Sequence, residues 1–323
     1  MIVPAAQSGT AARPVLLFVF GVPRSGTSAL TRVLSLCGGA LPAGMRGADA
    51  ANPRGYWEPR ASLLLNREIM ERHGSVAIDP SLRLLEEGAF DAEEKAAYIA
   101  KIGAFLQRLP TAPLVVMKDL LIIVLSDMWF EAARLAGFDI AAVIMVRHPQ
   151  EVIASHVAHY RASPELSSAL WLKYNLLAER HTRTVPRVFV HYPNLLDDWR
   201  QEVTRISTAL GIDLNTRDEG AIEEFLSPDL RRQRHCGPVT DGFGTDWMSA
   251  AYKALCAAAR DEPLDRSVLD RVFEGYRASE HDFRVAFENC RRRGFLFRLM
   301  RPSVQKPIIE LIALAHRRRG TWA

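Results

Sequence analysis

Residues 15–28 read VLLFVFGVPRSGTS, an apolar run followed by a turn that glycines bound on both sides. The apolar stretch that comes next, Leu30–Leu36, is typical of a helix. In the order strand, turn, helix, the N–H groups of the turn and the free N–H groups at the helix start point at one place. The helix dipole adds partial positive charge there. The stretch therefore predicts an anion site that is built mainly from backbone.

The spacing from Gly21 to Ser28 nearly matches the nucleotide-binding P-loop, Gly-x-x-x-x-Gly-Lys-Ser/Thr. Thr27 stands at the lysine position, and the cation, Arg24, lies inside the loop. A kinase or ATPase uses that lysine on the β- and γ-phosphates. We therefore expect a 5′-phosphate site without ordinary ATP hydrolysis or phosphoryl transfer. The expected contacts come from Pro23, Arg24, Ser25, Gly26, Thr27 and Ser28.

A second segment has the same order of elements. The apolar run Ile140–Val146 is followed by Arg147, and Pro149 suits the first position of a new helix that carries Ser155. If the strand end meets that helix, Arg147 and Ser155 can hold one phosphate together. The alternative is that Arg147 pairs with Glu151 and Ser155 is an exposed helical serine.

With both segments in view, the sequence resembles the sulfotransferases that use 3′-phosphoadenosine 5′-phosphosulfate (PAPS) as donor. In that family a P-loop-like element holds the 5′-phosphosulfate, and an Arg followed eight residues later by a Ser holds the 3′-phosphate. These positions correspond here to residues 24–28 and to Arg147 and Ser155. The segment NPRGYWE, residues 52–58, resembles bacterial sulfotransferase-like proteins associated with surface polysaccharides or glycoconjugates. The resemblance extends from about residue 15 to residue 200.

The resemblance implies in-line transfer of a sulfuryl group from PAPS to a hydroxyl of a carbohydrate or glycoconjugate, without a metal ion. We expect Arg24 and Lys118 to stabilise the charge that develops on the bridging oxygen. Glu58 is the expected base, with neighbouring aromatic side chains raising its pKa. Alternatively, Glu58 caps the helix that begins near Ala61. His159 is the second candidate for the base.

Two further donor contacts follow from the resemblance. Tyr192, in a Tyr-x-x-Leu segment, either lies near the adenine or seals the corner between a strand and a helix. A late motif that closes over the 3′-phosphate has only a faint counterpart at Arg293-Gly294. Arg231 or Arg232 is the alternative for that clamp.

The order of apolar runs predicts the fold. Runs at 15–20, 114–117, 140–146 and 187–192 alternate with helical stretches, which favours a P-loop-type parallel sheet with helices on both faces and a helical C-terminal region. We expect a disordered leader at 1–13, one α/β domain at 14–300 and a basic helix or tail at 301–323. Arg24, Lys118, Arg147 and Tyr192 all fall at carboxyl ends of strands, where such sheets bind ligands.

Composition narrows the class of protein. The chain of 323 residues is 48% hydrophobic and 24% charged, with a formal net charge of +4, which is ordinary for a globular protein. The four cysteines are scattered, so we expect thiols in a reducing compartment, without zinc, and a cytoplasmic location. No apolar run reaches the ~18 residues of a membrane span. The basic C-terminal helix is expected to dock on its own protein, with contact to a membrane surface as the alternative.

Three other classes of function fit the sequence less well. A P-loop kinase is disfavoured by Thr27 and by Lys118, which interrupts the apolar-run-plus-Asp pattern before Asp119. A catalytically silent nucleotide-binding module is disfavoured by the two complete phosphate segments. Nucleic-acid binding is not expected, because the basic clusters are not interleaved with aromatic residues.

Overall fold

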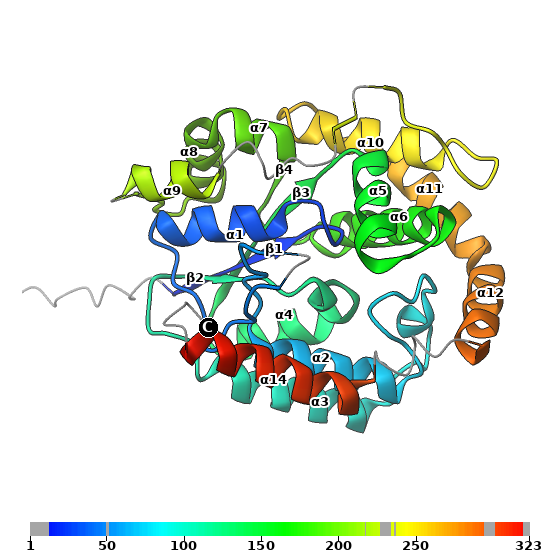
Figure 1. Cartoon of the computed structure of the whole chain (residues 1–323), viewed down its shortest axis with the longest axis horizontal. Coiled ribbons are helices and arrows are strands. Elements are labelled where there is room, and N and C mark those ends of the chain that lie inside the picture. The colour runs from blue at the N-terminus through cyan, green and yellow to red at the C-terminus, as the bar shows by residue number, and fades with distance from the viewer. Residues whose placement is uncertain are drawn as a thin grey trace, which may run out of the picture.

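The four apolar runs form four parallel strands in the computed structural model, which describes residues 13–49, 52–216, 218–226, 234–235, 237–293 and 301–318 (Figure 1). The strands are β1 (Val15–Phe20), β2 (Leu114–Met117), β3 (Asp139–Val146) and β4 (Arg187–His191). Hydrogen bonds place them in the order β2-β1-β3-β4. The predicted α/β class, a parallel sheet with helices on both faces, is confirmed.

Alternate side chains of each strand enter two separate hydrophobic clusters, because successive residues of a strand point to opposite faces. Leu17 and Val143 pack on one face with α1 (Thr27–Leu36) and α8 (Trp199–Leu210). Phe18 and Ile144 pack on the other face in the larger cluster. Its helices include α4 (Ser126–Leu135) and α6 (Pro164–His181). Both faces are covered, which explains why the strands read as continuous apolar runs rather than alternating ones.

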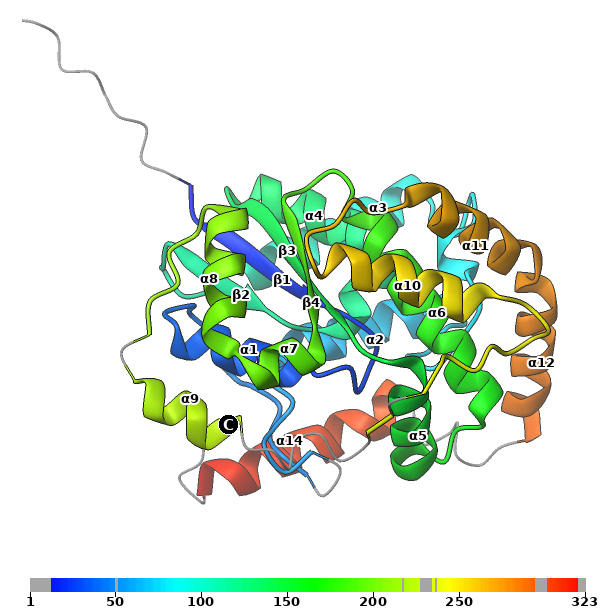
Figure 2. The ribbon, with the colours of Figure 1, turned by 90° about the horizontal axis from the view of Figure 1, so that it is seen from above.

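The remaining elements surround this three-layer core (Figures 1 and 2). They are α2 (Arg60–Arg72), η1 (Arg83–Leu85), α3 (Ala92–Leu106), η2 (Leu120–Leu125), α5 (Pro149–Tyr160), α7 (Tyr192–Asp197), α9 (Glu219–Phe225), α10 (Trp247–Ala258), α11 (Arg266–Ala278), α12 (Glu280–Arg293) and α14 (Pro302–Arg318).

The segment after β4 forms two helices, α7 and α8, rather than one. The backbone at Asp198 leaves the helical region, with φ −148° and ψ 82°, and the Asp198 side chain accepts a hydrogen bond from the N–H of Gln201. An aspartate in that conformation begins a new helix more readily than it continues one. The chain also breaks between α5 and α6, where Ser163 caps α6 and Pro164 is its first residue.

The strand order creates the crevice that holds the candidate site. The chain leaves β1 for β2 on one side, and then places β3 on the other side of β1. In an open parallel sheet, ligands usually bind in a crevice at the carboxyl ends of the strands. This crevice lies between two strands whose connections leave in opposite directions, as they do here. The loop after β1 and Arg147 after β3 are therefore neighbours, although they are more than 120 residues apart in the sequence.

The C-terminal helix α14 lies against α2 (Figure 1). Arg60 Nε is 3.4 Å from Glu310 Oε1, and the Arg67 guanidinium contacts the side-chain oxygen of Gln305. Arg13, at the end of the expected leader, donates to the carbonyls of Gly137 and Arg134. Among the described residues, no helix combines the length and apolar character needed to cross a bilayer.

Candidate active site

The loop after β1 is shaped by three residues with positive φ: Gly21 (148°), Arg24 (72°) and Gly26 (101°). Gly26 is the N-cap of α1, and no side chain caps this end of the helix or adds an acidic group to its first turn. A Cβ on Gly26 would overlap the ring of Tyr192, so the loop and α7 approach as closely as a bare glycine allows. The start of α1 therefore offers backbone N–H groups and positive dipole to an anion.

The two predicted phosphate segments contact each other directly. Arg24 Nε donates to Ser155 Oγ at 3.0 Å, and Arg147 Nη1 donates to the carbonyl of Arg24 at 2.9 Å. The Arg147 guanidinium lies over the Tyr192 ring, 4.5 Å from its centroid. Arg147 Nε also pairs with Glu151 at 2.7 Å. The Arg147–Glu151 pair of the second alternative is thus present, and the strand end also meets the helix of Ser155, as the first alternative requires. Ser155 is buried rather than exposed.

Ser25 occupies a different place from its neighbours. Its N–H donates to the carbonyl of Val22, and its hydroxyl is fully buried beneath the loop, close to Gly21. Pro23, Arg24, Gly26, Thr27 and Ser28 line the cavity above the loop. In the structure, Ser25 therefore holds the turn together.

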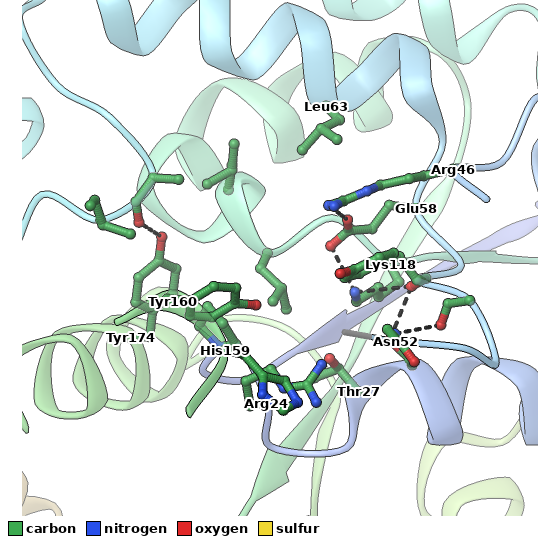
Figure 3. A pocket seen from close by; sticks show the side chains of 18 of the residues that line it. Arg24, Thr27, Arg46, Asn52, Glu58, Leu63, Lys118, His159, Tyr160 and Tyr174 are labelled. Carbon is green, nitrogen blue, oxygen red and sulfur yellow. Dashed lines mark hydrogen bonds and ion pairs between the residues drawn. The ribbon is translucent and has the colours of Figure 1, made fainter. Parts of the chain in front are cut away.

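Glu58 and Lys118 form a buried ion pair at the edge of the same cavity (Figure 3). Lys118 Nζ is 2.7 Å from Glu58 Oε1, and the side chains are 2% and 6% exposed, respectively. Lys118 Nζ also donates to the carbonyl of Tyr56, as does Ser28 Oγ from the start of α1. The ion pair and the phosphate loop are thus joined through one backbone carbonyl.

The expected rise in the pKa of Glu58 is wrong. Burial on its own would raise that pKa, but the charges of Lys118 and Arg46 outweigh burial and hold it below its ordinary value. Nor does Glu58 cap the following helix, because Pro59 is the N-cap of α2 and no side chain caps it. Glu58 is therefore a carboxylate that stays charged at neutral pH.

The aromatic neighbours of Glu58 anchor the loop. Tyr56 OH donates to Asp49 at 2.9 Å, and Trp57 Nε1 donates to the carbonyl of Arg54 at 3.0 Å. Both side chains are buried. These contacts fix the backbone that leads into Glu58, and so they help to set where its carboxylate points.

Two arginines at the cavity were not identified from the sequence. Arg46 Nη1 is 3.5 Å from Glu58 Oε2, because short backbone pairing joins the segment at 44–46 to the segment at 58–60. Arg67 extends into the cavity from α2, and burial lowers its pKa. Neither arginine lies in a motif; the only signal for Arg46 was its place in a glycine-rich loop near Glu58.

The two histidines of α5 differ in their surroundings. His156 is buried, its Nε2 lies 2.9 Å from the carbonyl of Pro23, and burial lowers its pKa to about 4. It is therefore neutral at pH 7, and it supports the loop after β1 through its contact with the Pro23 carbonyl. His159 lines the cavity on the side of Arg24 and Tyr160 (Figure 3). Its role as a base stays a prediction.

These groups line a cavity of about 570 Å³ at the carboxyl edge of the sheet. At one end are Tyr192 and Phe225, which pack with the cluster of α1 and α8. At the other end are Leu63 and Leu121, which belong to the larger cluster. Arg231, Arg232 and Gly294, considered for a late phosphate clamp, lie outside the described residues. Arg293 is the last residue of α12.

Three solved structures are similar to this chain. The sulfotransferase domain from the curacin biosynthetic pathway is 14% identical, with a TM-score of 0.43 over 78% of this chain and 100% of that one. The sulfotransferase domain from the Synechococcus PCC 7002 olefin synthase is 21% identical, with a TM-score of 0.42 over 84% and 97%. Sulfotransferase STF1 from Mycobacterium tuberculosis H37Rv is 15% identical, with a TM-score of 0.35 over 68% and 72%.

No protein-family model and no curated protein sequence matches the chain. We therefore infer a function from the residues of the site.

Proposed function

We propose that this protein transfers a sulfuryl group from PAPS to the hydroxyl of an acceptor. The observation that carries the proposal is that one cavity brings together the loop after β1, Arg147 with Ser155, and a buried Glu58–Lys118 pair. A donor with both a 5′-phosphosulfate and a 3′-phosphate uses two anion sites, and a hydroxyl acceptor uses a base.

The lining residues suit such a donor. The start of α1 and Arg24 would hold the 5′-phosphosulfate, because backbone N–H groups and a guanidinium converge there. Arg147 and Ser155 would hold the 3′-phosphate, since both line the cavity beside Arg24. Tyr192 lines the same end of the cavity, but it is 2% exposed and its ring packs against Gly26 and the Arg147 guanidinium. These contacts favour the role of sealing the corner between β4 and α7 over a contact with the adenine.

The chemistry follows from charge and position. Glu58 would take the proton of the acceptor hydroxyl while that oxygen bonds to sulfur and the bond from sulfur to the bridging phosphate oxygen breaks. Lys118 and Arg24 would stabilise the negative charge left on the bridging oxygen. PAPS supplies the sulfuryl group, and 3′-phosphoadenosine 5′-phosphate leaves. The carbohydrate acceptor and cytoplasmic location expected from the sequence stay predictions.

The surroundings of Asp119 disfavour the kinase alternative. In many P-loop enzymes an aspartate helps to hold the metal ion near the phosphates. Here the Asp119 carboxylate accepts hydrogen bonds from Ser62 Oγ, Asn66 Nδ2 and the N–H of Leu121. Burial, together with the nearby Glu58 charge, raises the pKa of Asp119 to about 6. Asp119 thus serves to cap η2 and to tie it to α2.

Thermal shifts with three nucleotides test the donor assignment. A ligand at 100 times its dissociation constant stabilises a protein by about 2.7 kcal/mol, which raises Tm by several degrees. We expect 3′-phosphoadenosine 5′-phosphate to raise Tm more than ADP, which lacks the 3′-phosphate, or ATP with Mg²⁺, at equal concentrations. A larger shift with ATP and Mg²⁺ would contradict the proposal and favour a kinase.

The pH dependence of kcat/KM distinguishes the two candidate bases. Because Lys118 and Arg46 keep the pKa of Glu58 below its ordinary value, Glu58 stays deprotonated as pH falls. We therefore expect kcat/KM to stay flat on the acid side from pH 8 down to about 5. A histidine base with an ordinary pKa near 6.5 would instead lose activity tenfold per pH unit below that value. An acid limb near pH 6.5 would contradict Glu58 as the base.

A further inference from the structure

The cavity continues beyond the Glu58–Lys118 pair into an apolar arm between α2, η2 and α6. In Figure 3, Leu63 and Tyr174 border the open space that Glu58 and Lys118 face from another side. The arm is lined by aliphatic and aromatic side chains: Leu63, Met70, Val76, Ala77, Ile78, Leu120, Leu121 and Tyr174.

The side of this arm that α2 and η2 form belongs to the hydrophobic core, whereas Val76, Ala77 and Ile78 are partly exposed. Its side chains from α2 and η2, such as Met70 and Leu121, belong to the larger hydrophobic cluster and are at most 9% exposed. Water in such a space has few polar partners, so an apolar ligand gains by displacing it. The arm therefore favours a ligand that brings apolar surface to it.

The arm offers few groups that could bind several hydroxyls of a sugar. Tyr174 OH already donates to the carbonyl of Ala77 at 2.9 Å. Ser75 Oγ lines the cavity, is buried and, within the described part of the chain, has no hydrogen-bond partner, so it can meet one polar group. Arg67, Glu71 and Gln305 also line the cavity, at partly exposed positions of α2 and α14, and Arg67 contacts Gln305. A desolvated sugar hydroxyl without a partner costs free energy.

We propose that the acceptor, in place of the carbohydrate expected from the sequence, is an aryl or alkyl alcohol whose apolar body occupies the apolar arm. The proposal rests on the sulfuryl transfer proposed above. The hydroxyl meets Glu58, which takes its proton, and the oxygen gains the sulfuryl group from the donor. The product is an organic sulfate ester, and the donor leaves as 3′-phosphoadenosine 5′-phosphate. Ser75 contacts a single polar atom of the acceptor.

The first experiment compares acceptors at saturating PAPS. The apolar probes are 2-naphthol and 1-octanol, the sugar probes are methyl β-glucoside and N-acetylglucosamine, and the release of 3′-phosphoadenosine 5′-phosphate is measured. We expect kcat/KM for the apolar alcohols to exceed that for the sugars by about tenfold or more, because the arm makes contacts with an apolar body only. A higher kcat/KM for the sugars than for the apolar alcohols would overturn the inference.

The second experiment fills the arm. Ala77→Phe adds a ring to the lining, and we expect it to raise KM for 2-naphthol by about tenfold or more while the Kd of 3′-phosphoadenosine 5′-phosphate is unchanged. The matched control is Ala100→Phe, on the exposed side of α3 and outside the cavity lining. If Ala77→Phe does not fold, Val76→Thr keeps the volume and adds a hydroxyl, and it should raise the same KM a few-fold. An unchanged KM in a folded variant would overturn the inference.

A binding measurement separates failure of the acceptor inference from failure of the proposed function. We expect 2-naphthol to raise the Tm of the wild-type complex with 3′-phosphoadenosine 5′-phosphate further, and to do so less in Ala77→Phe. If the bisphosphate binds but 2-naphthol adds no shift, the apolar acceptor is wrong and the donor site stands. If the bisphosphate itself does not bind, the proposed function fails, and this inference fails with it.

Discussion

Glu58→Gln is expected to lower kcat by about 10²–10⁴, the usual contribution of a general base, while the Kd of 3′-phosphoadenosine 5′-phosphate stays the same. The amide keeps the size and the hydrogen-bond acceptor of the side chain, but it cannot take a proton. Initial rates with a saturating acceptor give kcat, and a titration of the bisphosphate gives Kd. The two measurements separate loss of chemistry from loss of the donor site.

The variant also leaves Lys118 buried without its anion, and this effect needs a control. Removing one partner of a buried ion pair can cost about 3–5 kcal/mol of stability. Lys118→Met and the double variant Glu58→Gln/Lys118→Met supply that control. The double variant removes both charges, so it should regain the Tm that Glu58→Gln loses. Turnover is not read from the double variant, because Lys118 is itself proposed to stabilise the bridging oxygen. A Glu58→Gln protein that is folded at the assay temperature and still has a low kcat assigns the loss to the base.

Turnover of Glu58→Gln within a few-fold of the wild type would contradict the assignment. The base would then be sought at His159, where His159→Gln should produce the larger loss. The pH profile gives an independent answer, because it reports the pKa of the essential base without any substitution.

The sequence predicted the sheet well, for a physical reason. Strands that are buried on both faces appear as continuous apolar runs, and the four runs have the length and spacing of a parallel sheet. The order β2-β1-β3-β4 was not predicted, because strand order depends on contacts between elements far apart in the chain. The site residues at strand ends were nevertheless found together. Arg24, Lys118, Arg147 and Tyr192 all line one cavity.

The residues that the sequence did not reveal come from loops and helix faces. Arg46 reaches Glu58 only because two loop segments pair with each other, and that pairing has no periodic signal. The direction of the pKa shift at Glu58 was wrong for the same reason, since it depends on the charges of Lys118 and Arg46. The apolar arm includes Val76, Ala77 and Ile78 from an irregular segment, whose pattern alone does not distinguish core from ligand lining.

Arg147→Lys is expected to remove the preference of the protein for a 3′-phosphate. Arginine presents a planar fork to a phosphate, whereas lysine presents a single ammonium group. Each charge-assisted hydrogen bond that is lost costs about 1.5–3 kcal/mol, so the Kd of 3′-phosphoadenosine 5′-phosphate should rise by about tenfold or more. Lysine is preferred to alanine because Glu151 is 1% exposed and needs a nearby cation.

The ratio of two affinities makes this test specific. Arg147 also donates to the carbonyl of Arg24 and pairs with Glu151, so a loss of binding could come from a displaced loop. A displaced loop would weaken the binding of ADP and of the bisphosphate equally, because both would place phosphates at the start of α1. Loss of a 3′-phosphate contact weakens the binding of the bisphosphate alone and brings its Kd toward that of ADP. Arg200→Lys, at an exposed pair with Glu219, is the matched control and should change neither Kd. An equal loss for both nucleotides would show that Arg147 supports the loop and that the 3′-phosphate is bound elsewhere.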